Sequence, residues 1–245
     1  DTAADGSARL AVGAKNYEKF GNHNSEGAVF LFTFTGTDSS SFAGGSLAAV
    51  ILDQTAGTYT DSAPISFNQT LGAIDQFGAS VSLDGTMLAV GSQKDDGYNT
   101  PGDAGNAGAV YLYTFDDTSF TNPTLQGTIG VDYTGAKDID LGDAAASQDL
   151  LDGADQFGHG VSLDDNRLAV VSISDDGSGD GAGGNGAVYL FTFSDSTFSG
   201  GSLAATTGAD YSGAKDIDFG TDNDYNTNSA DGMESVSLDG TDLAI

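Results

Sequence analysis

Residues 75–115 read DQFGASVSLDGTMLAVGSQKDDGYNTPGDAGNAGAVYLYTF and contain the pattern that decides the fold. Apolar and polar residues alternate over Ser80–Leu83, which is typical of a half-buried strand. Asp84-Gly85 provides the positive φ of a two-residue hairpin turn, so Met87–Gly91 should return antiparallel. After a Gly- and Asp-rich loop, Ala109–Phe115 forms a third strand. It is apolar on both faces and must therefore be covered on both sides.

Most of the rest of the chain repeats this stretch with a period of about 80 residues. Asp-Gln-Phe-Gly occurs at 75–78 and 155–158, and Gly-Ala-Val-(Phe/Tyr)-Leu-(Phe/Tyr)-Thr-Phe occurs at 27–34, 108–115 and 186–193. A fourth, weaker strand fits Leu125–Val131 and its counterparts. We therefore expect one repeat domain, 1–245, made of a first repeat that lacks its first strand (1–74), a second repeat (75–154), a third repeat (155–230) and the start of a fourth (231–245).

The pattern predicts an all-β fold in which each repeat is a β-propeller-type blade of four antiparallel strands. A β-sandwich would need polar outward faces, which Ala109–Phe115 does not provide. About three repeats do not close a ring, because propellers need roughly four to eight blades. We expect a partial propeller, one completed by other copies, or an open stack. Both chain ends fall within the second strand of the unit, which favours further blades in the intact protein.

The chain resembles the FG-GAP repeat at Phe77-Gly78, Val81–Leu83, Leu88–Gly91 and Gly108–Tyr111. This resemblance implies the β-propeller of integrin α subunits and of many bacterial surface proteins, and the bacterial type is the nearer one. Integrin-type blades often hold calcium between their first two strands. Here that connection is only Leu83-Asp84-Gly85-Thr86, which is too short to surround an ion.

The charge of the chain excludes several classes of partner. Its 36 acids and 7 Lys and Arg give a formal net charge of −29, so neither nucleic acid nor an anionic membrane surface is an expected partner. Cysteine is absent, which excludes disulfides and thiolate zinc sites. No apolar run is long enough for membrane insertion. Nearly all the acids are aspartates, which suit divalent cations in loops and also keep a β-rich protein soluble.

The loops between the second and third strands contain candidate calcium ligands, because calcium binds six to eight oxygens on a flexible loop. The candidates are Asp95, Asp96, Asp103 and Asn106 in one loop and Asp175, Asp176, Asp180 and Asn185 in the equivalent loop. The same residues would also suit a solvated rim of ordinary turns.

The connectors Lys137–Asp140 and Lys215–Asp218 share the sequence Lys-Asp-Ile-Asp. They could form an exposed recognition edge, but we favour packing of Ile139 and Leu141 under the blade with the lysine paired to an aspartate.

No catalytic motif is present, and the two histidines, His23 and His159, occupy non-equivalent positions. We therefore expect a protein that is not an enzyme; a propeller-borne hydrolase or lyase has less support. The resemblance implies an extracellular or cell-surface adhesion module that binds a protein or glycan ligand or neighbouring copies, and the acidic loops indicate calcium as its cofactor. The alternative is a structural spacer or filament module of a large surface protein.

Overall fold

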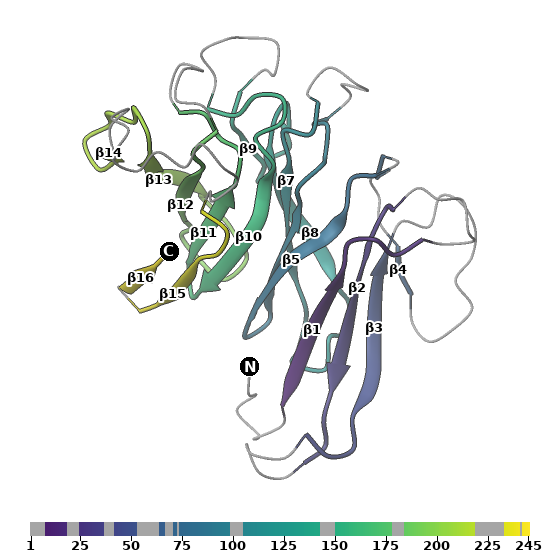
Figure 1. Cartoon of the computed structure of the whole chain (residues 1–245). Coiled ribbons are helices and arrows are strands. Elements are labelled where there is room, and N and C mark those ends of the chain that lie inside the picture. The colour runs from purple at the N-terminus through teal and green to yellow at the C-terminus, as the bar shows by residue number, and fades with distance from the viewer. Residues whose placement is uncertain are drawn as a thin grey trace.

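The computed structural model describes residues 8–18, 25–36, 42–52, 64–66, 71–72, 74–98, 105–142, 150–177, 184–218, 233–240 and 242–245. Every regular element in these ranges is a β-strand, which confirms the all-β prediction (Figure 1). Within the same ranges, no helix is long and apolar enough to cross a membrane.

The strands form three larger sheets and one hairpin, each continuous in sequence. Blade 1 contains β1 (Arg9–Ala14), β2 (Ala28–Thr33), β3 (Ser46–Leu52) and β4 (Pro64–Ser66). Blade 2 contains β5 (Phe77–Asp84), β6 (Met87–Ser92), β7 (Ala109–Thr114), β8 (Thr124–Gly130) and β9 (Ile139–Asp140). Blade 3 contains β10 (Phe157–Asp164), β11 (Arg167–Ser172), β12 (Ala187–Thr192), β13 (Ser202–Gly208) and β14 (Ile217–Asp218). The C-terminal hairpin contains β15 (Ser237–Asp239) and β16 (Asp242–Ala244).

The four main strands of blades 2 and 3 pair antiparallel, as the sequence predicts, with Leu83 opposite Leu88 across the Asp84-Gly85 turn. The prediction of four strands per blade omitted one short strand, which pairs in parallel with the fourth strand. In blade 2 this strand is β9, where Ile139 lies opposite Ile129. It comes from the Lys-Asp-Ile-Asp connector, whose two residues of pairing are too few to show a period in the sequence.

The connector of blade 2 packs largely as we favoured. Leu141 is buried in the core, and Ile139 packs against it. The partner of Lys137 is different from the expected aspartate: its Nζ donates to Gln126 Oε1 at 2.5 Å and to the carbonyl of Thr197 at 2.6 Å. Thr197 belongs to blade 3, so this lysine links two blades. In blade 3 the equivalent Ile217 is exposed.

The blades pack face to face. Their first strands β5, β10 and β15 lie next to one another in sequence order, as the first strands do in a β-propeller (Figure 1). Strand β7 shows why both of its faces are apolar. Val110 and Leu112 pack in the core shared with blade 3, whereas Tyr111 and Tyr113 pack in the core shared with blade 1. Each side chain is almost completely buried, as expected for a strand covered on both sides.

Consecutive blades touch through their backbones where Phe-Gly meets the preceding Gly-Ala-Val. Parallel bridges join Gly27 to Phe77 and Gly108 to Phe157. A Cβ on Gly108, which has a φ of 93°, would lie 2.1 Å from the Phe157 carbonyl oxygen. Only glycine permits this approach, so the two repeated motifs form one contact between blades.

A second set of close approaches lies between the second strand of one blade and the first strand of the next. A Cβ on Gly91 would lie 1.9 Å from the Gly158 carbonyl oxygen. Val171 and Met233 occupy the corresponding positions at the last junction, where they join an apolar cluster between blade 3 and the C-terminal hairpin. Side-chain packing therefore replaces backbone contact at that junction.

First strands are also linked by side chains that accept backbone hydrogen bonds. Ser82 Oγ accepts from Leu163 N at 2.9 Å, and Asp84 Oδ2 accepts from Asp165 N at 2.7 Å. The same pair recurs one blade later, where Ser162 accepts from Leu238 N at 2.9 Å and Asp164 accepts from Gly240 N at 3.0 Å. The Ser and Asp of the repeated Val-Ser-Leu-Asp sequence thus hydrogen-bond each first strand to the first strand of the next blade.

We predict that Gly91→Ala destabilises the protein by about 1–3 kcal/mol, because the added methyl group overlaps the backbone of blade 3. The matched control is Gly85→Asp. No atom lies within 4 Å of a Cβ built there, and Asp165 occupies the equivalent turn with a φ of 51°. Urea unfolding at 25 °C measures both variants. An equal loss of stability in the two would contradict the close-approach explanation.

Candidate functional site

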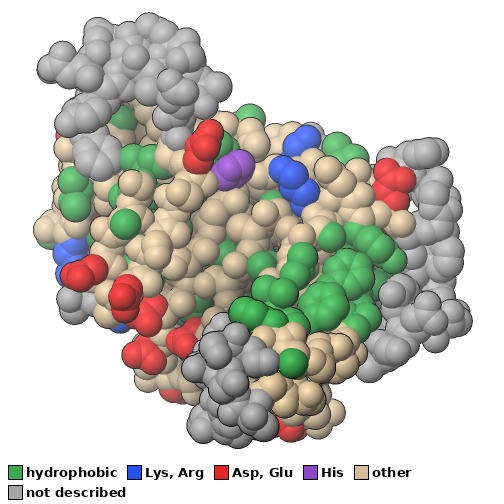
Figure 2. All heavy atoms as spheres, turned by 60° about the horizontal axis from the view of Figure 1, so that its bottom comes forward, with side chains coloured by type: hydrophobic (Ala, Val, Ile, Leu, Met, Phe, Trp, Pro, Cys, Tyr) green, Lys and Arg blue, Asp and Glu red, His purple; other side chains and the backbone are tan. Residues whose placement is uncertain are grey.

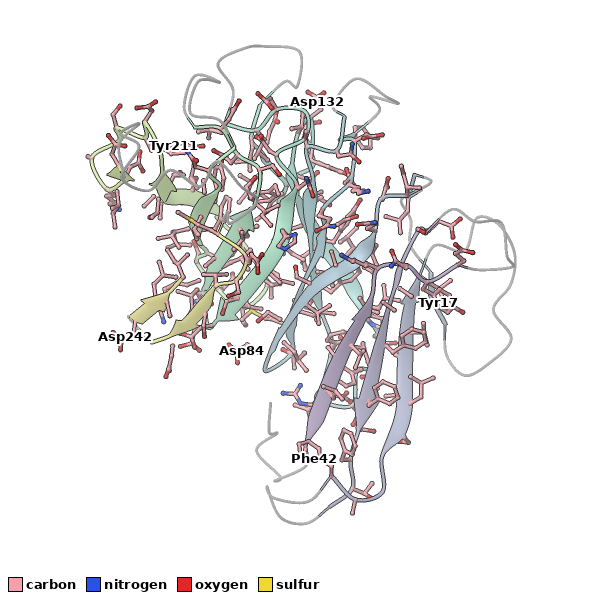
Figure 3. All side chains as sticks on the ribbon, viewed as in Figure 1. Tyr17, Phe42, Asp84, Asp132, Tyr211 and Asp242 are labelled. Carbon is pink, nitrogen blue, oxygen red and sulfur yellow. The ribbon has the colours of Figure 1, made fainter. Side chains whose placement is uncertain are left out.

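The predicted site residues that the structure describes lie at one end of the blades. We define the loop rim as the β6–β7 and β11–β12 loops together with the turns that precede β5 and β10. In Figure 3, Asp132 and Tyr211 mark this end, and Asp84 and Asp242 mark the opposite, hairpin end. Both Asp-rich loops therefore lie on the same side of the molecule.

Asp95 is held inside blade 2. Its side chain is buried, and it accepts hydrogen bonds from Tyr111 Oη at 2.6 Å, Tyr133 Oη at 2.9 Å and Gly97 N at 2.9 Å. Burial raises the pKa of Asp95, and it raises the pKa of both tyrosines as well. The carboxylate and the two hydroxyl groups thus satisfy one another in a buried region.

Asp175 makes the same arrangement in blade 3. Its oxygens accept from Tyr189 Oη at 2.5 Å and from Tyr211 Oη at 3.0 Å, and Gly177 N donates at 2.9 Å. Both aspartates were predicted as calcium ligands, but here their oxygens bind tyrosines. We call each group an Asp–Tyr–Tyr cluster and leave both aspartates out of the cation site proposed below.

Blade 1 lacks the Asp–Tyr–Tyr cluster. The residues that replace it support a structural role for the cluster in blades 2 and 3. Tyr17 stands where blades 2 and 3 have the aspartate, and Phe30 stands where they have the first tyrosine. Their rings meet edge to face with centroids 5.5 Å apart. Without a buried carboxylate, a hydroxyl group at position 30 would lose that acceptor, so the two substitutions are chemically matched.

The other predicted ligands are distributed unevenly. Asp96 Oδ1 accepts from Asn106 N at 2.9 Å and so closes the β6–β7 loop across its base. Asn185 is half-buried in the equivalent loop of blade 3. Asp103 and Asp180 lie outside the described residues.

Three carboxylates converge on the loop rim of blade 3. One oxygen from each of Asp152, Asp155 and Asp176 lies within 4.8 Å of the others. Of these, only Asp176 was predicted from sequence. Asp155 begins the Asp-Gln-Phe-Gly segment, which the contact with blade 2 fixes in place, and its Oδ2 accepts from Asp152 N at 2.9 Å.

Electrostatics set Asp155 apart from an ordinary surface acid. It is buried, and burial together with the charges of Asp175, Asp152 and Asp176 raises its pKa to about 8. A divalent cation would offset this repulsion and needs oxygen ligands of this kind. Blade 2 has Gly72 where blade 3 has Asp152, so it provides only Asp75 and Asp96 at the equivalent place.

Residues 72–113 match the family model for the FG-GAP repeat. The matched segment runs from the turn before β5 into β7, so it contains both halves of the glycine contact unit. The match confirms the resemblance in blade 2. No curated protein matches the chain.

We predict that Tyr111→Phe costs about 1–3 kcal/mol of stability, because the buried Asp95 carboxylate loses a donor that no water replaces. The control is Tyr98→Phe on the same loop rim, where the ring is 48 % exposed and a change within about 0.5 kcal/mol is expected. Thermal unfolding at neutral pH measures both. Equal midpoints for the two variants would show that the Asp–Tyr–Tyr cluster does not stabilise blade 2.

Proposed function

We propose that the chain is a non-catalytic binding module of the extracellular space or cell surface, which presents its loop rim to a protein or glycan ligand. The FG-GAP match is the observation that carries the proposal, because repeats of this type suggest β-propeller binding modules. Polar loops on a rigid sheet scaffold suit recognition. The net charge of −29 supports a partner that is not a polyanion.

We further propose that binding depends on calcium held by Asp152, Asp155 and Asp176. Three carboxylates provide half or fewer of the six to eight oxygens that calcium requires, and backbone carbonyls and water would complete the shell. The cation would hold the turn before β10 against the β11–β12 loop and so fix the shape of the loop rim. Magnesium fits less well, since it demands a stricter octahedral geometry.

A non-catalytic role is supported by the side chains at the loop rim. His159 is the only histidine in the described ranges, and its Nδ1 lies 2.7 Å from Gln93 Oε1 in a contact between blades 2 and 3. Burial lowers the pKa of His159. A structural spacer is the second candidate function, supported by the exposed apolar side chains Leu10, Val12 and Phe42 of blade 1.

Calcium at about 1 mM should raise the midpoint of thermal unfolding by several degrees relative to chelator, because the cation binds the folded state. Asp176→Asn should abolish most of this rise. Asp96→Asn, the equivalent change in blade 2, keeps the acceptor for Asn106 N and should leave the rise unchanged. A midpoint that ignores calcium in the unmodified chain would refute the cation site, and a rise lost equally in both variants would place the ion elsewhere.

The same two variants test the binding role. Fluorescently labelled chain is applied to glycan arrays and to immobilised cell-surface proteins, with calcium and with chelator. A calcium-dependent signal that Asp176→Asn removes and Asp96→Asn retains would support the proposal. The absence of any specific signal would favour the spacer.

The pKa of Asp155 predicts a dependence of stability on pH. Its folded-state pKa of about 8 exceeds the ordinary value of 3.8, so the folded state holds the proton more tightly than the unfolded state. The resulting stabilisation is complete below about pH 4 and is lost as the pH rises through 8. In chelator, the free energy of unfolding should therefore fall between about pH 5 and 8.5, by at most about 1.4 kcal/mol per pH unit.

Urea unfolding across that pH range provides the measurement. Asp155→Asn keeps an acceptor for Asp152 N but cannot titrate, so its stability should vary less with pH. Saturating calcium should also flatten the dependence, because a bound cation holds the carboxylate ionised. An unchanged slope in Asp155→Asn would assign the pH dependence to other groups.

A further inference from the structure

Tyr98 is an exposed aromatic side chain at the loop rim of blade 2, in the β6–β7 loop. Its side chain is 48 % exposed. Its backbone is fixed, because Tyr98 N donates to the Val131 carbonyl at 3.1 Å. Its ring packs on the buried ring of Tyr133, with centroids 5.9 Å apart and an interplanar angle of 49°. The ring is thus supported by the protein, while much of its surface remains open to a partner.

The repeats show that the fold does not require an apolar side chain at this position. Blade 3 has Ser178 where blade 2 has Tyr98, although the three preceding residues are identical in the two blades. Ile74 is a second case, since its side chain is 51 % exposed in the turn before β5 and its φ of 76° is strained for a β-branched residue. The equivalent residue of blade 3 is Ala154, with a φ of 80°. Exposed apolar side chains that the scaffold does not need favour a role in binding.

The surroundings of Tyr98 are acidic. Asp96 lies in the same loop, and the carbonyl that accepts from Tyr98 N belongs to the residue before Asp132. Asp140 Oδ1 accepts from Asp132 N at 3.0 Å, which brings a third carboxylate to this end of blade 2. Lys94 is the one basic residue in the described part of the β6–β7 loop. We define the Tyr98 patch as Tyr98, Asp96, Asp132 and Asp140, an open aromatic ring with negative charge beside it.

We propose that the Tyr98 patch binds a basic segment of a partner protein, with an arginine or lysine side chain over the Tyr98 ring. A cation gains from the quadrupole of a tyrosine ring, and the neighbouring carboxylates add to the attraction. The net charge of −29 steers basic partners toward the chain and repels acidic ones. A neutral glycan would stack on the ring but would gain nothing from the negative charge.

The Asp–Tyr–Tyr cluster of blade 2 makes the Tyr98 patch rigid. Tyr133, which supports the Tyr98 ring, donates its hydroxyl hydrogen bond to the buried Asp95. Because the ring is ordered before a partner arrives, little side-chain entropy is lost on binding. The inference goes beyond the binding role proposed above, since the candidate cation site is on blade 3 and takes no part. Binding to the Tyr98 patch should therefore be the same in calcium and in chelator.

Fluorescence polarisation of a labelled peptide tests the Tyr98 patch. The probe is a short Gly-Arg repeat with fluorescein at one end, and its control contains citrulline, which has the shape of arginine without the charge. In chelator, the unmodified chain should bind the arginine peptide about tenfold more tightly than the citrulline peptide. Tyr98→Leu keeps an apolar contact with Tyr133 but removes the ring, so it should bind the arginine peptide about three- to tenfold more weakly. Tyr98→Phe keeps the ring and should bind within about twofold of the unmodified chain.

Phe42→Leu is the matched control for removal of an exposed aromatic ring. Phe42 is 69 % exposed at the hairpin end of blade 1 (Figure 3), where Figure 2 shows hydrophobic side chains gathered over blade 1, and its replacement should leave the affinity unchanged. Equal affinities for the two peptides, or an unchanged affinity in Tyr98→Leu, would overturn the proposal. So would a chain that ignores the arginine peptide and binds a neutral glycan through Tyr98. If the proposal fails while the arrays give a calcium-dependent signal, the binding role proposed above still stands.

Discussion

The structure depends on the close approach of each Phe-Gly backbone to the Gly-Ala-Val segment of the preceding blade. The approach leaves no room for a Cβ at Gly108, so one conformation of the chain is selected at each junction. The turn before the first strand is fixed with it, since Gln156 N and Phe157 N both donate to the blade 2 backbone. Asp155 lies in that turn. Blade packing therefore places the acid that the candidate cation site needs.

The strong net charge suggests a uniformly solvated surface, but the aspartates serve three separate purposes. Asp95 and Asp175 are buried under tyrosines. Others, such as Asp138 and Asp195, accept hydrogen bonds within turns and strands. Hydrogen bonds from the Thr197 hydroxyl, from Thr197 N and from Ser199 N lower the pKa of Asp195 to about 2. The carboxylates of Asp152, Asp155 and Asp176 face one another, and Asp155 also accepts a hydrogen bond from Asp152 N. Only this third arrangement stores repulsion that a cation would relieve.

Sequence periodicity predicted the strands, their hairpins and the two apolar faces of β7, because these features follow from local alternation and burial. It could not assign the aspartates. An aspartate in a Gly-rich loop has the same sequence signal whether it points to solvent or under the sheet. The matched change to Tyr17 and Phe30 in blade 1 held the missing information. Asp152 was missed for the opposite reason, since blade 2 has Gly72 there and a repeat comparison discards what is not repeated.

The junction between blade 3 and the C-terminal hairpin is stabilised by different contacts from those between blades 1, 2 and 3. Between blades 1, 2 and 3, glycine backbones interlock and large apolar faces are covered on both sides. At the C-terminal hairpin, Val171 and Met233 replace the glycine contact, and β15 and β16 together present only a small apolar surface to blade 3. Burial is roughly proportional to stabilisation, so β16 contributes little compared with a full blade.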